Sequence, residues 1–319
     1  MFWDDEAGFF TDARGTGSVG SRRYHPLFSL LFLHSSLGFA LMRERVARAA
    51  AFVEQQLLTE HGMRTVPPGE SAKEGETVLD SWYPFWDVAA LKLLRRAGRA
   101  DAIMRWLRLC EETLEELGYC PEYLALRSFR KGRVDAWTHH GAASNLNCVT
   151  AWSRALREAV FGMEIDPGGM THIPLMLPVG TASLGNFSWR RGSWSIEIDN
   201  AGPFLEEILV DGHLLAGAAK IPIGYATAGD HQIRIRYGQA RPGPYFEELV
   251  NAELLSAAVT GDGVVARVRG IGTLDGTFYS PRRPLISLDH APVESRWDER
   301  TGRGYFGAVM AGEHTLRLG

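Results

Sequence analysis

The chain has 319 residues, of which 45% are hydrophobic and 23% charged, so it is long enough for one large or two medium-sized domains, and we expect two. A net charge of -4 and a pI near 6.2 exclude a strongly basic surface, so we expect no nucleic-acid partner. No apolar run reaches the roughly 18 residues of a membrane span, and the acidic start Met1–Glu6 is unlike a signal peptide. We therefore expect a soluble, cytoplasmic protein with no membrane partner.

Cysteine usage points to a reducing compartment. Cys110, Cys120 and Cys148 are odd in number and lack close metal-ligand spacing. We expect free thiols, no metal and no cofactor.

The N-terminus is unusual for the beginning of a domain. Phe2-Trp3 followed by Asp4-Asp5-Glu6 reads like the end of a helix that is already under way. We therefore expect that upstream sequence, and with it an N-terminal half of the fold, is missing.

Helical periodicity dominates the first half. Apolar residues recur at spacings of three and four in three segments, at Met42, Val46, Ala49, Val53 and Leu57, then Ile103, Leu107, Cys110, Leu114 and Leu117, then Leu146, Val149, Trp152, Leu156 and Val160. Two further segments, Tyr24–Ala40 and Val88–Leu94, are apolar nearly all round, which is typical of helices covered by other helices. We expect an α-helical domain over residues 1–165, built as a partial α/α toroid of hairpins.

The period changes near Asp166. Pro167-Gly168-Gly169 is predicted to end the last helix, after which apolar residues alternate with polar ones, as in Trp194–Asp199 and Ile233–Tyr237. Asp211-Gly212 between two apolar runs is a strong hairpin signal. We expect an antiparallel β-sandwich over residues 166–319, hence an α+β protein, and no internal repeat.

Glu122 is the first candidate for catalysis. It lies in the turn Gly118–Tyr123, where Pro121 fixes the preceding backbone, as suits a base whose position matters. The alternative is an ordinary acidic residue on a solvated turn next to a helix.

An aromatic motif precedes the apolar segment Val88–Leu94. Asp80 can cap the helix that Pro84 begins, or it can act as a second catalytic carboxylate. The candidates for sugar binding here are Trp82, Tyr83, Trp86 and Asp87, although buried aromatic residues are more often part of a core.

Hydrogen-bonding residues gather before the last predicted helix. Asp135 is a third candidate carboxylate, and the predicted binding residues are Trp137, His139, His140 and Asn145. The adjacent histidines lack helical i, i+4 spacing and a third ligand, so a hydroxyl-binding role is favoured over a zinc site.

These motifs resemble the closing part of the six-hairpin glycosidases, the (α/α)6 toroids that include trehalase, glucoamylase and α-L-rhamnosidase. The resemblance lies in Tyr83-Pro84-Phe85-Trp86, in Glu122-Tyr123, in the junction from Phe161 to Pro178, and in Trp3–Phe10, which is similar to a turn in the middle of that barrel. It implies the C-terminal half of a toroid plus a β-domain, with Glu122 as general base and Tyr123 in the substrate pocket.

The resemblance also implies that the general acid comes from an earlier half of the barrel. Inversion needs two carboxylates roughly 6.5 to 9.5 Å apart. Asp135, Asp80 or a partner chain would have to supply the second one.

Three functions therefore remain open. The first is an inverting glycoside hydrolase, either complete or truncated without its general acid. The second is a polysaccharide lyase that uses Asn145, His139 or His140, and Tyr83. The third is a non-catalytic fragment that binds glycan or packs against another subunit, which can be a second copy in a homo-oligomer. All but a purely structural fragment have a carbohydrate as partner.

Overall fold

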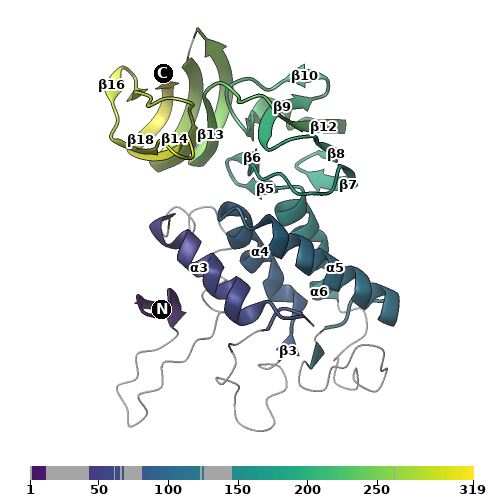
Figure 1. The fold of residues 1–319 in the computed structure, drawn as a ribbon. Helices are drawn as coiled ribbons and strands as arrows, with labels where there is room; N and C mark the ends of the chain where they lie inside the picture. Colours follow the sequence, from purple (N-terminus) through teal and green to yellow (C-terminus); the bar gives the residue numbers. More distant parts are fainter. Residues whose placement is uncertain are drawn as a thin grey trace. The chain divides into compact units, whose positions relative to one another are not determined.

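The computed structural model describes residues 2–11, 43–60, 62–64, 67, 81–122, 124–125, 146–261 and 263–319. The chain separates into two compact units, Met1–Val160 and Phe161–Gly319 (Figure 1). Helices predominate in the described part of the first unit and strands in that of the second.

The first unit contains four α-helices within its described residues. They are α3 (Val46–Phe52), α4 (Asp87–Arg96), α5 (Ala100–Leu117) and α6 (Leu146–Ala155). A 3-10 turn (η1, Arg43–Arg45) precedes α3, and π-helical turns extend α3 (η2, Val53–Leu57) and α6 (η5, Leu156–Val160). The three predicted amphipathic segments are therefore helical.

The prediction of an α/α toroid is wrong. In the described part of the chain α4 lies at the centre, buried from Asp87 to Arg95, and α3, α5 and α6 each pack against it (Figure 1). A toroid has an inner ring of helices around an axis, whereas here one apolar helix occupies the middle. Strands, moreover, form most of the second unit, so the resemblance to the six-hairpin glycosidases does not extend to the fold.

The buried face of α5 also differs from its predicted stripe. Trp106, Leu109 and Thr113 are buried, whereas Leu114 is 44% exposed. Of the predicted stripe, Ile103 and Cys110 are buried as expected, whereas Leu107 and Leu117 are only partly buried.

A buried ion cluster joins α4 to the end of α6. The Glu158 carboxylate is 1% exposed and lies 3.3 Å from Lys92 Nζ and 2.7 Å from Arg154 Nε. Arg95 Nη1 donates to the carbonyl oxygens of Ala159 and Val160, two of the acceptors that a helix end leaves unsatisfied. These bonds fix the C-terminal end of the first unit.

The N-terminal segment is a hairpin and not the end of a helix. β1 (Phe2–Asp4) pairs antiparallel with β2 (Phe9–Thr11). The Asp4 carboxylate accepts from the backbone N–H groups of Glu6 and Ala7, which closes the turn in the way short acidic side chains favour.

The second unit contains three sheets. The first has the strand order β10-β9-β12-β8-β7, the second β11-β6-β5, and the third β13-β14-β18-β15-β16, with β17 also paired to β18. The bounds of the strands in the first two sheets are β5 Met163–Asp166, β6 Gly169–His172, β7 Thr181–Trp189, β8 Gly192–Asn200, β9 Phe204–Val210, β10 His213–Leu214, β11 Lys220–Ile221 and β12 Gly229–Gly238. Those in the third are β13 Tyr245–Thr260, β14 Gly263–Tyr279, β15 Ile286–Leu288, β16 Ala291–Pro292, β17 Ser295–Asp298 and β18 Arg303–Leu318, and a 3-10 turn (η6, Ile223–Tyr225) precedes β12.

The prediction of a purely antiparallel sandwich is wrong. β12 pairs with β8 in parallel, from Gly229 opposite Gly192 to Tyr237 opposite Asn200. β8 and β9 follow each other in the sequence but are not neighbours in the sheet, because β12 lies between them. β12 runs antiparallel to β9 and parallel to β8. The turn at Pro167-Gly168 joins β5 to β6 and does not end a helix.

Local strand predictions are nevertheless confirmed. Trp194, Ile196 and Ile198 are buried along β8, and Asp211-Gly212 is the two-residue turn between β9 and β10, with Val210 opposite His213. Both turn residues have positive φ, which is typical of a type I′ hairpin turn.

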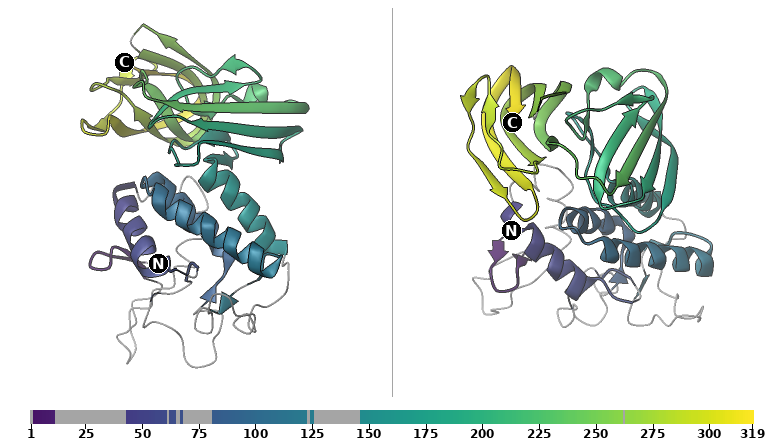
Figure 2. Two further views of the ribbon diagram at one scale, coloured as in Figure 1. Left: turned by 45° about the vertical axis from the view of Figure 1, so that its right-hand side comes forward. Right: turned by 45° about the horizontal axis from the view of Figure 1, so that its top comes forward.

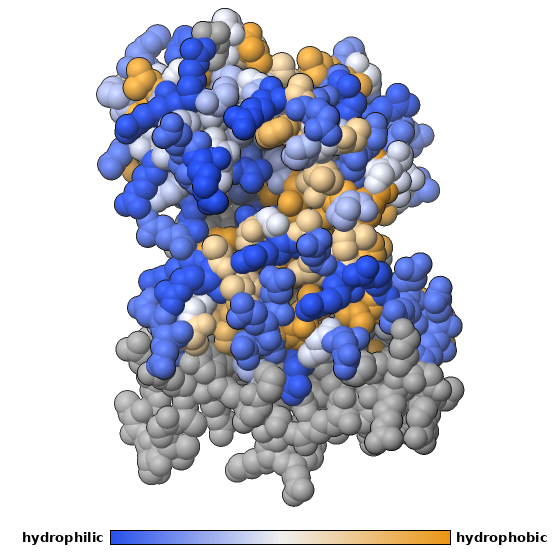
Figure 3. Space-filling view, viewed as in Figure 1, coloured by the Kyte–Doolittle hydropathy of each residue, from blue (hydrophilic) through white to orange (hydrophobic). Residues whose placement is uncertain are grey.

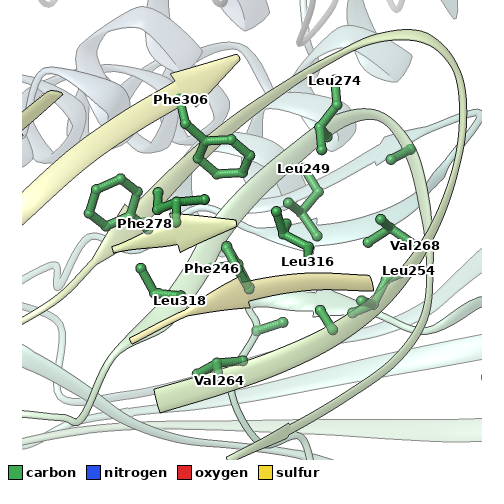
Figure 4. Packing of buried hydrophobic residues seen from close by; sticks show 14 of the residues in the cluster. Phe246, Leu249, Leu254, Val264, Val268, Leu274, Phe278, Phe306, Leu316 and Leu318 are labelled. Atoms are coloured by element: carbon green, nitrogen blue, oxygen red, sulfur yellow. The ribbon is translucent and has the colours of Figure 1, made fainter. Parts of the chain in front are cut away.

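The third sheet curls around its own core. Register shifts in β13 at three places bend these long strands, and the buried cluster includes Phe246, Phe278 and Phe306 (Figure 4). Figure 2 shows this yellow-green sheet beside the teal sheet of β7–β12. Over β13, β14 and β18 the surface seen in Figure 3 is mostly hydrophilic, in keeping with the exposed ion pairs of Arg269 with Glu253 and Glu313.

Among the helices in the described ranges, none is both long and apolar enough to cross a membrane.

Candidate functional site

A short strand pair brings Glu122 beside the start of α4. β3 (Ser81–Trp82) pairs antiparallel with β4 (Leu124–Ala125), with Trp82 opposite Leu124. Pro84 then begins the 3-10 turn η3 (Pro84–Trp86) that leads into α4, as its fixed φ favours. Because Tyr83 follows β3 and Glu122 precedes β4 by two residues, the pairing holds these two residues near each other.

Glu122, Tyr83 and Cys148 form one cluster. Cys148 Sγ donates to the backbone carbonyl of Glu122 at 3.2 Å. The pKa of the Tyr83 phenol is raised above its usual value, first by burial and then by the neighbouring Cys148 and Glu122. Three segments that are far apart in the sequence thus meet at Glu122, which is partly buried.

Three partly exposed rings lie next to this cluster. The ring centroids of Tyr83 and Phe85 are 6.3 Å apart, those of Tyr83 and Trp86 are 6.4 Å apart, and Phe85 meets Trp86 edge to face at 5.1 Å. None of the three is fully buried. We call Tyr83, Phe85 and Trp86 the aromatic platform.

Asp87 and Trp82 belong to the interior beneath the platform. Asp87 is 1% exposed, and its Oδ2 accepts from Trp82 Nε1 at 2.8 Å and from Trp106 Nε1 at 2.6 Å. Burial raises the pKa of Asp87 to about 7, against the opposing effect of the indoles of Trp106, Trp82 and Trp152. The Trp152 N–H makes no hydrogen bond of normal geometry. Trp82 is 0% exposed, so neither Trp82 nor Asp87 offers a surface to a ligand in this structure.

The three cysteines are buried free thiols around Asp87. Burial raises the pKa of Cys120 to about 12 and that of Cys148 to about 11. They are therefore protonated near neutral pH and are weak nucleophiles. No cluster of three or more His, Cys, Asp or Glu side chains suited to a metal ion occurs among the described residues.

All seven of the remaining predicted site residues lie outside the described ranges. They are Asp80, Tyr123, Asp135, Trp137, His139, His140 and Asn145. The structure therefore brings together Glu122, Tyr83 and Trp86 from the predicted set, and the roles of the others stay predictions.

Sequence reasoning missed three members of this region. Trp106 is next to Leu107, the position that the periodicity predicts as buried, and a tryptophan in that helix was a signal that could have been used. Phe85 lies inside the predicted motif, but it was not singled out. Cys148 carries no local signal, because its partner Glu122 is 26 residues away.

A second cluster, in the strand-rich unit, has the composition of a catalytic triad. His231 Nδ1 lies 2.7 Å from Asp211 Oδ2, and His231 Nε2 lies 3.3 Å from Thr227 Oγ1. Asp211 Oδ1 also accepts from the backbone N–H of Gln232 at 2.8 Å. A hydroxyl, an imidazole and a carboxylate in a row is the arrangement that activates a nucleophile.

The same arrangement recurs without the hydroxyl. His314 Nδ1 lies 2.6 Å from Asp289 Oδ2, Thr315 N–H donates to Asp289 Oδ1, and His314 Nε2 lies 3.0 Å from the carbonyl oxygen of Ala311. Asp289, like Asp211, starts a two-residue hairpin turn with positive φ. The same Asp–His arrangement is thus found at two hairpin turns. It indicates that each histidine fastens a turn to a neighbouring strand, so the cluster at Asp211 is structural.

Comparisons with known proteins add no assignment. A search of protein-family models finds no match to the chain, and neither does a search of curated proteins. The function has to be argued from the geometry of the site.

Proposed function

We propose that this protein binds carbohydrate, and that the aromatic platform with Glu122 forms the binding face. The observation that carries the proposal is the group of three contacting, partly exposed rings next to a half-buried carboxylate. The proximity of Glu122 to Tyr83 supports a single face.

The chemistry of sugars fits this combination. A pyranose has C–H faces that pack on flat rings, and hydroxyl groups that both donate and accept hydrogen bonds. The rings of the platform supply area at small cost in side-chain entropy, and the Glu122 carboxylate accepts from hydroxyls. Buried Asp87 keeps the platform in place, because its two indole bonds fix the first turn of α4.

Cleavage of the bound glycan stays a prediction from the sequence. Inversion requires a second carboxylate about 6.5–9.5 Å from the first. Asp87 does not meet this need, since its carboxylate is enclosed and bonded to Trp82 and Trp106. The other two candidates, Asp80 and Asp135, lie outside the described residues.

Binding is tested by calorimetric titration of the full chain with maltotetraose, cellotetraose and chitotetraose. We expect one of these to bind, and we expect Trp86→Ala and Glu122→Gln each to weaken that binding about tenfold or more, which is about 1.4 kcal/mol. The matched controls are Leu114→Ala, an exposed apolar residue of α5, and Glu115→Gln on the same helix.

Two outcomes would overturn the proposal. One is that no glycan of a wider panel binds. The other is that Trp86→Ala and Glu122→Gln bind as tightly as the parent. Analysis of the titrated glycans for shortened products tests hydrolysis separately, since Glu122→Gln would abolish it.

A further inference from the structure

A hollow of about 180 Å³ lies in the second unit, where strands of its first and third sheets end. Its rings come from the start of β9 (Phe204), the end of β12 (Tyr237), the start of β13 (Tyr245) and the end of β14 (Tyr279). The rings of Tyr245 and Tyr279 stack at 5.7 Å, while Phe204 and Tyr245 are partly exposed. The sequence pattern placed Tyr237 in a strand but predicted none of these four residues as a binding residue.

A charged side chain of the lining, Arg303, is held in place by Glu247, which lies behind it and does not line the hollow. Arg303, at the start of β18, lines the hollow and donates from Nε to Glu247 Oε1 at 2.8 Å and from Nη2 to the Pro174 carbonyl at 3.4 Å. The Tyr245 hydroxyl also donates to Glu247 Oε1, at 3.4 Å. Burial, followed by the charge of Glu247, raises the pKa of Tyr245 well above its usual value, so this hydroxyl keeps its proton.

Both members of this ion pair keep bonding capacity. Within the part of the chain that the structure describes, neither Arg303 Nη1 nor Glu247 Oε2 makes a hydrogen bond. The guanidinium side chain is 49% exposed and the carboxylate side chain 9% exposed. A ligand in the hollow therefore meets a free donor from Arg303, with the acceptor Glu247 directly behind it.

We propose that this hollow is a second binding site, separate from the aromatic platform, that takes one neutral monosaccharide unit. Its volume lies below the about 300–1,000 Å³ of sites for drug-sized molecules, which limits the occupant to about one ring. The rings match the C–H faces of a pyranose. The Arg303 donor matches its hydroxyls, which accept hydrogen bonds as well as donate them.

The ion pair determines which sugars fit. A uronate carboxylate near Arg303 also faces the buried negative charge of Glu247, and an amino sugar faces the guanidinium. A neutral hydroxyl meets neither repulsion. Glu247 is thus a specificity-determining residue, since it cancels the charge that would otherwise attract acids.

The test uses ligand-observed NMR and calorimetry on the full chain. The probes are the methyl glycosides of glucose, galactose and mannose, with glucuronate and glucosamine for comparison. We expect at least one neutral glycoside to bind about tenfold more tightly than either charged sugar. Glu247→Gln should reverse the preference, raising the affinity for glucuronate about tenfold.

Two further variants of the hollow and one control away from it distinguish a loss of binding from a loss of stability. Arg303→Gln with Glu247→Gln removes both charges together, so no buried charge is left unpaired, and it should weaken neutral binding about tenfold. Phe204→Ala should do the same by removing a ring. The control is Arg269→Gln with Glu313→Gln, an exposed pair of the same chemistry at 2.6 Å that does not line the hollow.

Each negative result has a distinct meaning. If the hollow variants bind every sugar as the parent does while Trp86→Ala abolishes binding, the second site is refuted and the proposed function stands. If glucuronate binds the parent as tightly as the neutral glycosides, the assignment of a neutral ligand is refuted. If no sugar binds the parent, both proposals fail.

Discussion

Replacing Asp87 with asparagine removes a buried charge while keeping the shape of the side chain. The asparagine oxygen can still accept from the indoles of Trp82 and Trp106, which now lie 2.8 and 2.6 Å from Asp87 Oδ2. The carboxylate of the parent pays a desolvation penalty whenever it is ionised, because it is 1% exposed. The two proteins should therefore respond differently to pH.

The raised pKa of Asp87 sets the size of this difference in the pH dependence of stability. Burial raises the pKa of Asp87 from 3.8 to about 7, which is about three units, and each unit corresponds to about 1.4 kcal/mol. Ionised Asp87 thus costs the folded state about 4 kcal/mol. Because the folded state binds this proton more tightly than the unfolded state, the contribution is favourable below pH 3.8 and is lost as the pH rises through about 7.

The assay is denaturant unfolding of both proteins between pH 5 and pH 8, compared as a difference so that other titrating groups cancel. The free energy of unfolding of the parent, relative to Asp87→Asn, should fall by about 3 kcal/mol between pH 5 and pH 7, which is about 1.4 kcal/mol for each pH unit, and should then level off up to pH 8. The indole N–H signals of Trp82 and Trp106 should shift in the parent with a midpoint near 7. Parallel pH profiles for parent and variant, or indole signals that do not move, would refute this account of the site.

Two smaller predictions concern turns. Gly62→Ala should destabilise the protein by at least about 1 kcal/mol more than Gly98→Ala in denaturant unfolding, since both have positive φ but only a Cβ at Gly62 would lie 2.5 Å from the Trp82 ring. Equal losses of unfolding free energy in the two variants would show that the Trp82 ring moves aside at no cost. In the Asp289–His314 pair, the hydrogen bond to Asp289 raises the pKa of His314, and a backbone hydrogen bond lowers that of Asp289. This pair should therefore stabilise most between the two pKa values, losing its contribution as pH rises through that of His314 or falls through that of Asp289. Asp289→Asn should lower the NMR titration midpoint of His314. An unchanged midpoint would show that the hydrogen bond to Asp289 does not stabilise the charged form of His314.

Local patterns predicted the elements of this protein well. The periodic segments ending at Leu57, Leu117 and Val160 are helical, and Val88–Leu94, apolar all round, lies in the helix at the centre of its unit. The alternation in β8 and the turn at Asp211-Gly212 are also as expected. These features depend on neighbours within a few residues, which a sequence displays directly.

The arrangement of those elements could not be predicted in the same way. The periodicity of a helix gives its buried face but not its neighbours, so a central α4 was taken for the inner member of a ring. Nor does the alternation in β12 indicate whether β8 beside it runs parallel. The motif at Tyr83–Trp86 suggested sugar-binding rings, yet which ring faces outward depends on Asp87 drawing Trp82 inward.

By itself the sequence determined the periodic helices of the first unit, the alternating strands β8 and β12, the turn between β9 and β10, and the aromatic and acidic residues near the start of α4. Tertiary structure alone decided that Glu122 meets Tyr83 and Cys148, and that Arg303 and Glu247 meet beside the rings of the hollow. The physical reason is range. Secondary structure follows from steric and solvation preferences of adjacent residues, whereas a binding site needs groups that are dozens of residues apart, and only the packing of sheets and helices brings those together.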